Sequence, residues 1–536
     1  MKSATKTLTF PLAGVARRRG YREAQRPYAA PYAVNVRGVE PLESRTRGGS
    51  RPGLMKAYTN DFGDTITAIA PVTSVDEDGS RQCDLVVVAD GVFSYIRDAA
   101  IISDTGSLRD DDGNEILTEA GDAIIFDTII ATVNPVGDSD AFAFVERGGK
   151  LYLADSVLRV YDPNTGIVDP VVASAGTIPT GCPLVTVYRD RLVLCGSDHL
   201  WYASRQSDPT DWYFGGDMDD PGRAVAGQLE ISGKIGEVVK AVIPHNDQAL
   251  AFAAQNALWT LRGDPVTGQL ISVSTEIGVI APGAWAKSPD GLLSFLSNDG
   301  VYLWAVGSSE HPVRFSSERV PTELLNVSPT TNRINMAYDP QGRGFHLFIT
   351  PATGLGTHWW LDLDNKAMWP VRFADGHQPV AVARYNYDAV GMSETILGCK
   401  DGYLRRFSAT ATTDDSTAIA SHILIGPFRV VSDDVTDGLL AEIHGILADN
   451  AGTVTWRIVM GNSAEAATDT AVAGIVSVLA SETPAGVAAS GTWSENRNKV
   501  ARPRTRGSWA VVWLSSSARW AYEAVAVKIQ QLGRLR

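Results

Sequence analysis

Cysteine and long apolar runs are both scarce in this sequence of 536 residues. Four widely scattered cysteines exclude a disulfide framework and predict reduced, partly buried thiols, although two of them are spaced so that they can face each other across a hairpin. The four are Cys83, Cys399 and the closer pair, Cys182 and Cys195. The longest nearly apolar run, residues 471–480, is about half as long as a membrane-spanning helix. Pro11 and the arginines at 17–19 interrupt any apolar stretch near the N-terminus, so we expect a soluble protein without a secretory signal, made in a cytoplasm.

Catalytic and metal-binding motifs are missing as well. None of the eight histidines has the spacing of a metal-ligand pair, and there is no CxxC, P-loop, GxGxxG or GxSxG motif. The segment Asp110–Glu119 comes near a calcium loop, but Leu108 stands where the first ligand should be, so a solvated turn explains it better. His199, His346 and His358 lie beside aromatic residues, where packing within a sheet is the better explanation. We therefore expect no enzymatic activity, no cofactor and no metal.

Charge is distributed unevenly along the chain. Residues 1–56 carry a net charge of +9 and residues 497–536 carry +8, whereas the whole chain carries −14, so the middle carries −31. Basic tails often bind nucleic acid. The simpler interpretation is that both basic ends pair with the acidic body of the same or a neighbouring subunit.

One hairpin pattern recurs along most of the chain. It consists of an alternating apolar run, a polar turn with Asp, Asn or Gly, and a second run rich in Tyr, Trp, Leu and Val, as at Asp90-Gly91 and Asp299-Gly300. The turns of seven copies lie at positions 90, 155, 198, 256, 299, 364 and 401. Their spacing of 37 to 65 residues suits four-stranded blades of roughly 40–50 residues with loop insertions. The sequence predicts an all-β fold with a β-propeller of six to eight blades; a β-sandwich or several small sheets is the alternative.

Composition divides the chain into three regions. Residues 1–55 lack periodicity and are rich in Arg, Pro and Gly, so we expect an extended basic arm that becomes ordered only in an assembly. Residues 56–410 hold the recurring hairpins of the predicted propeller. The Ser/Thr/Asp stretch at 408–418 indicates a linker, and alternating runs within 419–536 predict a C-terminal β-sandwich.

Several segments together resemble a known family. These segments are Pro31–Arg37, Arg45–Leu54, Tyr188–Leu194, Trp201–Arg205, Asp208–Trp212, Ile425–Pro427, Pro503–Gly507 and Trp520–Glu523. They resemble the propeller-bearing tail proteins of short-tailed phages (podoviruses): the tail nozzle, or tail tubular protein B, and the related tail accessory factor that stabilises packaged DNA. The resemblance spans nearly the whole chain and rests on architecture more than on any one motif.

The resemblance implies a virion protein of the phage tail. It would form a homohexameric ring below the portal and the adaptor, which are its head–tail connection partners, and would conduct the genome during ejection without sequence-specific DNA binding. Tail fibres or a needle are further candidate partners. The candidate assembly contacts are Arg45, Arg47, Arg51, Arg504, Arg506 and Trp520. An acidic body suits a conduit, because a basic lumen would retain DNA through counterion release.

Two other classes of function stay open. A receptor-binding or depolymerase β-propeller of the tail would have a cleft in which carboxylates and aromatic side chains converge. The segment Ser297–Trp304 comes near the Asp-box turn of sialidases, but its glycine follows the aspartate one position too early. A cellular scaffold propeller that binds protein partners is the third class.

Overall fold

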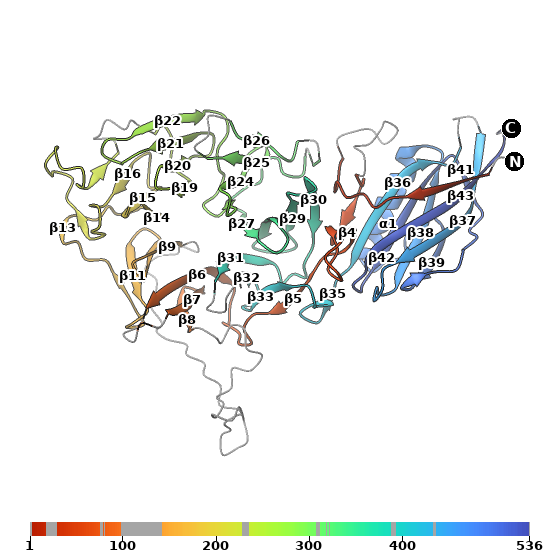
Figure 1. Ribbon diagram of the computed structural model, residues 1–536, viewed down its shortest axis with the longest axis horizontal. Coiled ribbons are helices and arrows are strands. Elements are labelled where there is room, and N and C mark those ends of the chain that lie inside the picture. Colours follow the sequence, from red (N-terminus) through yellow and green to blue (C-terminus); the bar gives the residue numbers. More distant parts are fainter. Residues whose placement is uncertain are drawn as a thin grey trace, which may run out of the picture.

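The computed structural model describes residues 3–17, 29–75, 79, 81–97, 142–227, 235–306, 311–317, 319–320, 322–386, 393–431 and 436–534. These residues form a propeller and a sandwich that lie beside each other along the long axis of the molecule (Figure 1). Both chain ends lie at the sandwich (Figure 1). The predicted all-β propeller fold is confirmed.

The described residues form seven sheets around a ring, which we number as blades 1 to 7 in chain order. Blade 1 contains β6 (Ile66–Val75), β7 (Arg81–Ala89) and β8 (Val92–Arg97). Blade 2 contains β9 (Ala143–Arg147), β10 (Lys150–Ala154), β11 (Leu158–Asp162) and β12 (Ile167–Pro170). Blade 3 contains β14 (Leu184–Tyr188), β15 (Arg191–Cys195), β16 (Trp201–Ala203) and β18 (Val225–Ala226). A short parallel pair, β13 (Ala175–Gly176) and β17 (Asp211–Trp212), joins the outer parts of blades 2 and 3.

Blades 4 to 6 repeat the four-stranded antiparallel order. Blade 4 contains β19 (Ala241–Asn246), β20 (Ala249–Ala253), β21 (Leu258–Arg262) and β22 (Gln269–Ser274). Blade 5 contains β23 (Trp285–Lys287), β24 (Leu292–Ser297), β25 (Gly300–Ala305) and β26 (Val313–Arg314). Blade 6 contains β27 (Asn332–Asp339), β28 (Gly344–Pro351), β29 (Thr357–Asp362) and β30 (Ala367–Val371).

Blade 7 closes the ring with a strand from the other end of the chain. Its own strands are β31 (Pro379–Tyr385), β32 (Glu394–Cys399), β33 (Leu404–Ser408), β34 (Thr413–Asp414) and β35 (Thr417–Ala418). Between β33 and β34 lies β5 (Gly53–Lys56), which pairs antiparallel with β33. The first strands β31 and β6 lie side by side. Because β5 precedes blade 1 in the sequence, its pairing with the last blade fastens the two ends of the ring together.

The turns expected from the sequence mark the blades. In six blades the expected turn residue lies between the second and third strands; Asp90 and Gly91, for example, have φ angles of 45° and 68°, as a type I′ turn requires. Blade 6 differs, because Asp364 lies between its third and fourth strands. The turn between its second and third strands, residues 352–356, contains neither Asp nor Asn.

Apolar side chains fill the spaces between adjacent blades, as the alternating strand pattern requires. Val86 and Phe93 of blade 1, for example, pack against Leu151 and Tyr161 of blade 2. A comparable cluster lies between blades 3 and 4, around Trp201. Each blade is therefore stabilised by burial against its neighbours, with separate apolar clusters at successive blade interfaces.

The C-terminal residues form two sheets that face each other. One sheet consists, in order, of β2 (Ala33–Val34), β36 (Ser421–Arg429), β42 (Trp509–Ser516), β38 (Val454–Gly461) and β39 (Val487–Trp493). The other consists of β1 (Ser3–Leu8), β43 (Tyr522–Arg534) and β37 (Thr436–Leu447), with β40 (Asn496–Arg497) and β41 (Thr505–Gly507) both paired to β37.

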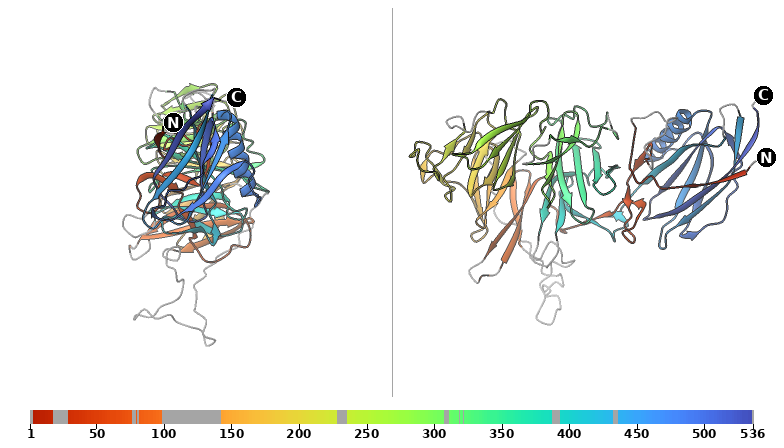
Figure 2. Two further views of the ribbon diagram at one scale, coloured as in Figure 1. Left: turned by 90° about the vertical axis from the view of Figure 1, so that its right-hand side faces the viewer. Right: turned by 45° about the horizontal axis from the view of Figure 1, so that its top comes forward.

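A helix, α1 (Ala464–Leu479), is an addition to the predicted sandwich and packs against the first of these sheets (Figure 2). Strand β42 is buried on both faces, since Val512 and Leu514 belong to the core between the sheets while Trp513 packs against the helix. Alanines on the buried helix face permit this close approach. The Ser463 side chain caps the helix by accepting a hydrogen bond from the backbone of the first turn.

The first 55 residues do not form the expected arm. β1 pairs with β43 and β2 pairs with β36, while β3 (Val36–Val39) and β4 (Thr46–Ser50) form a hairpin between propeller and sandwich. The described residues of this segment are therefore paired with sheets of both bodies within one chain, and their ordering on assembly stays a prediction. Strands of two to six residues that complete sheets built elsewhere carry too few positions to show a period of two.

Candidate functional site at the domain junction

The segment that joins the two bodies, residues 29–56, is here called the strap (Figure 1). Its turn between β2 and β3 contains Asn35, which is buried and has a φ of 56°. The Asn35 Nδ2 donates to the carbonyl of Ala420 at the start of the sandwich (3.0 Å), and its Oδ1 accepts from the backbone N–H of Arg372, just after blade 6 (2.8 Å). One amide side chain thus contacts both bodies.

Arg51 is the most fully engaged side chain of the strap. It is 0% exposed and forms a bidentate ion pair with Asp414, in which one nitrogen–oxygen distance is 2.8 Å. Its remaining donors reach the Asn35 side chain (2.9 Å) and the carbonyls of Pro52 (2.8 Å) and Arg372 (3.1 Å). Asp414 belongs to the stretch predicted as a linker, which is therefore part of the junction. Removing one partner of such a buried pair strands the other charge.

A second cluster surrounds Arg47. This side chain pairs with Glu40 (3.3 Å), with Glu43 (2.7 Å) and with Glu523 of β43 (3.7 Å). Glu40 is 1% exposed and accepts backbone hydrogen bonds from Glu43 (3.0 Å) and Arg45 (3.2 Å), so it also shapes the β3–β4 turn. The acids of this cluster lie in the two basic ends themselves, so it is the pair of Arg51 and Asp414 that joins a basic end to the acidic middle of the chain.

The six candidate assembly residues separate into two groups. Arg51 and Trp520 are buried within the chain. The Trp520 Nε1 donates to the Ser421 hydroxyl (2.9 Å). The backbone N–H of Trp520 donates to the Ser50 hydroxyl, and its carbonyl accepts from the backbone N–H of Ser50. These two side chains hold the junction together and are not available to a partner. Arg47 is mostly buried, with a side-chain exposure of 17%. The exposed candidates are Arg45, Arg504 and Arg506.

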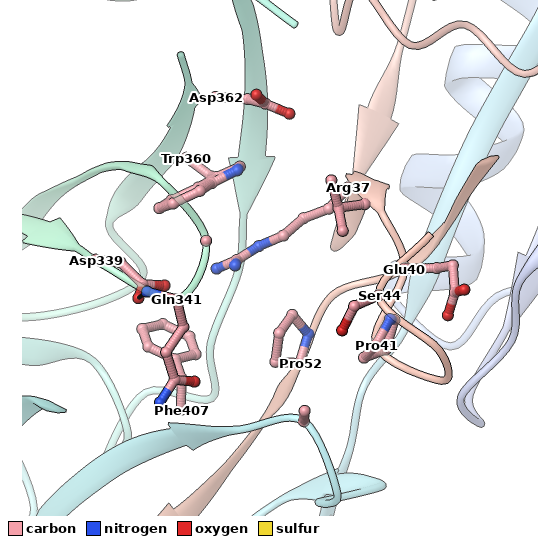
Figure 3. A pocket seen from close by; sticks show the side chains of 13 residues that line it. Arg37, Glu40, Pro41, Ser44, Pro52, Asp339, Gln341, Trp360, Asp362 and Phe407 are labelled. Carbon is pink, nitrogen blue, oxygen red and sulfur yellow. Dashed lines mark hydrogen bonds between the residues drawn. The ribbon is translucent and has the colours of Figure 1, made fainter. Parts of the chain in front are cut away.

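A cavity of about 100 Å³ lies between the strap and blades 6 and 7 (Figure 3). Arg37 of β3 points into it and is only 4% exposed. Its guanidinium lies 4.2 Å from the ring centre of Trp360 and 5.4 Å from that of Phe407. Burial lowers the pKa of Arg37 to about 10, and its Nε has no hydrogen-bond partner among the described residues.

The two carboxylates of blade 6 that line this cavity are already hydrogen-bonded within their own blade. Asp339 accepts from the backbone of Gln341 (2.9 Å), and Asp362 accepts from the backbone and side chain of Asn365 (2.9 and 2.8 Å). The negative charges of both carboxylates raise the pKa of Arg37 and so oppose the effect of burial, although neither carboxylate forms an ion pair with it. The arrangement fixes the strap onto blade 6 through aromatic and electrostatic contacts.

Two histidines lie beneath the strap. Burial lowers the pKa of His346 to about 4 and that of His358 to about 3, so both rings are neutral at pH 7. His346 stacks on Phe407 at 4.4 Å between ring centres, and His358 approaches Gln378 (3.4 Å). Packing explains these two, as expected. His199 differs, because it is exposed in a turn.

A larger polar pocket of about 590 Å³ lies at one mouth of the propeller, where β6, β27 and β31 begin. Its lining includes the hydroxyl groups of Thr65 and Thr67, the carboxylates of Asp64 and Asp90, and the amine of Lys400. Its polar lining suits a hydrophilic ligand.

No group of three or more His, Cys, Asp or Glu side chains in the described part of the chain is arranged to hold a metal ion. The segment Asp110–Glu119, which comes near a calcium loop, lies outside the described residues. All four cysteines are buried, and none of them forms a disulfide. Among the helices described, none is both long enough and apolar enough to cross a membrane.

No protein-family model and no curated protein matches this chain. Among solved structures it is similar to YCF48 bound to a D1 peptide, with 10% identity over 69% of this chain and 97% of that one and a TM-score of 0.39. It is also similar to the WD40 β-propeller domain of Doa1, with 12% identity over 66% and 97% and a TM-score of 0.36. The computationally designed Ika8 protein shows 16% identity over 65% and 98% and a TM-score of 0.34. At these TM-scores the likenesses carry no functional argument, and the blades of this chain themselves establish its propeller.

Sequence reasoning missed the partners of the strap. Asn35 and Asp414 come from the regions predicted as arm and linker, and Arg51 lies 363 positions from Asp414. The signal available in the sequence was that one segment without periodicity contains a basic residue and another contains an acidic residue. It does not identify which charges meet.

Proposed function

We propose that this chain is a structural subunit of the tail of a short-tailed phage, where it forms an oligomeric ring or nozzle below the portal and adaptor and conducts the genome. The observation that carries the proposal is the strap, which completes blade 7 through β5 and one sandwich sheet through β2. The buried pair of Arg51 and Asp414 lies between the two bodies, and we expect them to act as one stiff building block. Such a block suits a subunit whose task is to hold a fixed shape, and the resemblance of the sequence to nozzle proteins supplies the setting.

The charge distribution supports the same role. The middle of the chain, which includes the propeller, has a net charge of −31. Acidic surfaces repel phosphates, so a ring built from such subunits lets duplex DNA slide without retaining it. Stiffness and acidity together favour a conduit, with the virion tail as location and the adaptor as neighbour.

The test is made on particles produced by cells that carry the gene. Mass spectrometry of purified virions should find the chain in a fixed number of copies, and electron cryomicroscopy should place it in the tail. Deleting the gene should yield heads that lose their DNA. Particles that lack the chain, or a deletion that leaves infectivity unchanged, would refute the proposal.

The polar pocket at the propeller mouth favours a second candidate, a receptor-binding or depolymerase propeller of the tail. Threonine hydroxyls and the carboxylates of Asp64 and Asp90 are groups that bind sugars. In that case the isolated chain should bind or cleave host glycans, and Asp64→Asn should abolish the effect. The nozzle proposal expects neither binding nor turnover.

A further inference from the structure

A strongly basic edge runs along the sandwich. The segment from β40 to β41, residues 496–507, follows β37 along the outer side of its sheet, with Ala501 bonded to Ile443 through two backbone hydrogen bonds of 2.9 Å. Every second residue from position 502 is an exposed arginine: Arg502, Arg504 and Arg506. Of the three, only Arg506 lies in a strand, β41, and Arg504 precedes it with a φ of 52°. We call residues 496–507 the basic edge.

The cations of the basic edge are largely without partners. Arg502 approaches Glu442 at 3.7 Å and is itself 68% exposed. Among the described residues, no carboxylate forms an ion pair with Arg504, Arg506, Arg497 or Lys499. An exposed apolar side chain, Val500 (49% exposed), lies in the middle of this charged row.

The opposite charge gathers on blade 3. The loop around β17, residues 208–222, holds five aspartates, and we call it the acidic loop. Arg205 pairs with one of them, Asp220, at 2.8 Å. Asp217 and Asp219 are exposed, and neither has a cationic partner in the described part of the chain. Between them Met218 is 69% exposed.

The two surfaces cannot meet within one molecule. β17 pairs with β13, and β13 lies at the end of the propeller farthest from the sandwich, whereas β41 lies at the far side of the sandwich (Figure 1). We propose that the basic edge of one copy docks on the acidic loop of a second copy, with Val500 and Met218 at the centre of the contact. Because the two patches differ, the contact is head-to-tail and generates a closed ring or a filament.

Charge favours this partner over nucleic acid. Both surfaces belong to the same chain. The basic edge presents Val500 among its charges, and the acidic loop presents Tyr213 and Met218, which suits a protein interface with a charged rim. The net charge of −14 repels DNA from the molecule as a whole. The inference rests on the proposed function only in that both require the chain to assemble with itself.

Charge exchange in the full-length chain tests the contact. Arg504→Glu with Arg506→Glu, or Asp217→Lys with Asp219→Lys, should each weaken self-association about 100-fold or more, measured by analytical ultracentrifugation at about 0.15 M salt. All four substitutions in one chain restore opposite charges and should recover association to within about tenfold of the wild type. The matched control, Arg343→Glu with Lys366→Glu, changes two exposed cations of blade 6 and should associate normally.

Three results would overturn the inference. They are normal association of the basic-edge variant, a wild-type chain that is monomeric at every concentration reached, and a basic edge that binds duplex DNA in a gel-shift assay while its variant still associates normally. The proposed function fails separately, if purified particles lack the chain. If particles contain the basic-edge variant in the normal number of copies, the proposed contact is refuted but the proposed role in the tail is not.

Discussion

Arg51 and Arg504 come from the two basic ends of the chain, and their surroundings differ in almost every respect. Arg51 is 0% exposed, and all its hydrogen-bonding nitrogens contact its own chain, whereas Arg504 is exposed at the margin of the sandwich. The ends have nearly the same net charge, +9 and +8. Net charge therefore says little about what a basic segment does, because burial and the position of the acids decide whether it holds the fold together or faces a partner.

The largest difference should appear when each arginine is removed. Arg51→Ala leaves Asp414 buried without its cation and should lower the free energy of unfolding by about 3–5 kcal/mol. Arg504→Ala, the matched control, should change it by less than about 0.5 kcal/mol. Urea unfolding followed by tryptophan fluorescence measures both. Equal stability of the two variants would contradict the structural role of the strap.

Acid should destabilise the packing of blade 6 beneath the strap and leave the exposed basic edge unaffected. Burial lowers the pKa of His346 to about 4 and of His358 to about 3, with the charge of Arg51 adding to the effect, so both imidazoles bind protons more readily in the unfolded chain, with a pKa near 6.5. Stability is thus complete above pH 6.5 and is lost as the pH falls toward 4, by about 1–3 kcal/mol per histidine.

Unfolding curves at several pH values test this linkage. His358→Gln removes one titrating group and should flatten the loss between pH 6.5 and 4.5 relative to the wild type. An unchanged slope would mean that His358 is not buried as a neutral ring. The exposed His199 offers the control, since His199→Gln should leave the slope as it is.

A smaller loss is expected at the margin of the strap. Arg47→Ala removes the cation from the buried Glu40, whose carboxylate keeps its backbone hydrogen bonds, so the cost should be about 1–2 kcal/mol. Thermal unfolding detects a change of this size. A cost as large as that of Arg51→Ala would show that backbone bonds do not sustain Glu40.

The smallest effect is expected two positions earlier. The Arg45 side chain is 65% exposed, and its one ion-pair partner in the described part of the chain is Glu43, which is 42% exposed, at 3.1 Å. Exposed pairs of this kind contribute little, so Arg45→Ala should cost less than about 0.5 kcal/mol. The order of the costs at positions 51, 47 and 45 would then follow burial within one short segment. Any other order would break the comparison.

The blades were predictable because their information is local. Turns such as Asp90-Gly91 and Asp299-Gly300 announce a hairpin wherever they occur, and alternation supplies the strands around them. Blade 6 shows the limit, since its second-to-third turn lacks that signal and Asp364 marks the next turn instead. The sequence did not predict helix α1, because its alanine-rich face resembles an apolar strand as much as a helix.

The junction was not predictable from local pattern. β2 and β5 are two and four residues long, and each gains its stability from a sheet formed by residues far along the chain. Arg51 and Trp520 are among the predicted assembly contacts, but the sequence does not distinguish a contact within the chain from one between copies. Asp414 stands in a stretch whose composition is that of a loop, and only its place beside Arg51 gives it a role.

Hydrogen exchange of the isolated and the assembled chain tests the contrast between the two ends most directly. The account predicts that backbone amides of the strap, from Val36 to Lys56, exchange as slowly as those of the blade cores in both states, because they open only with the fold. Amides of residues 496–507 should exchange faster in the monomer and become protected on assembly. Rapid exchange of the strap in the monomer, with protection gained only on assembly, would contradict the account and restore the interpretation of the N-terminal segment as an arm.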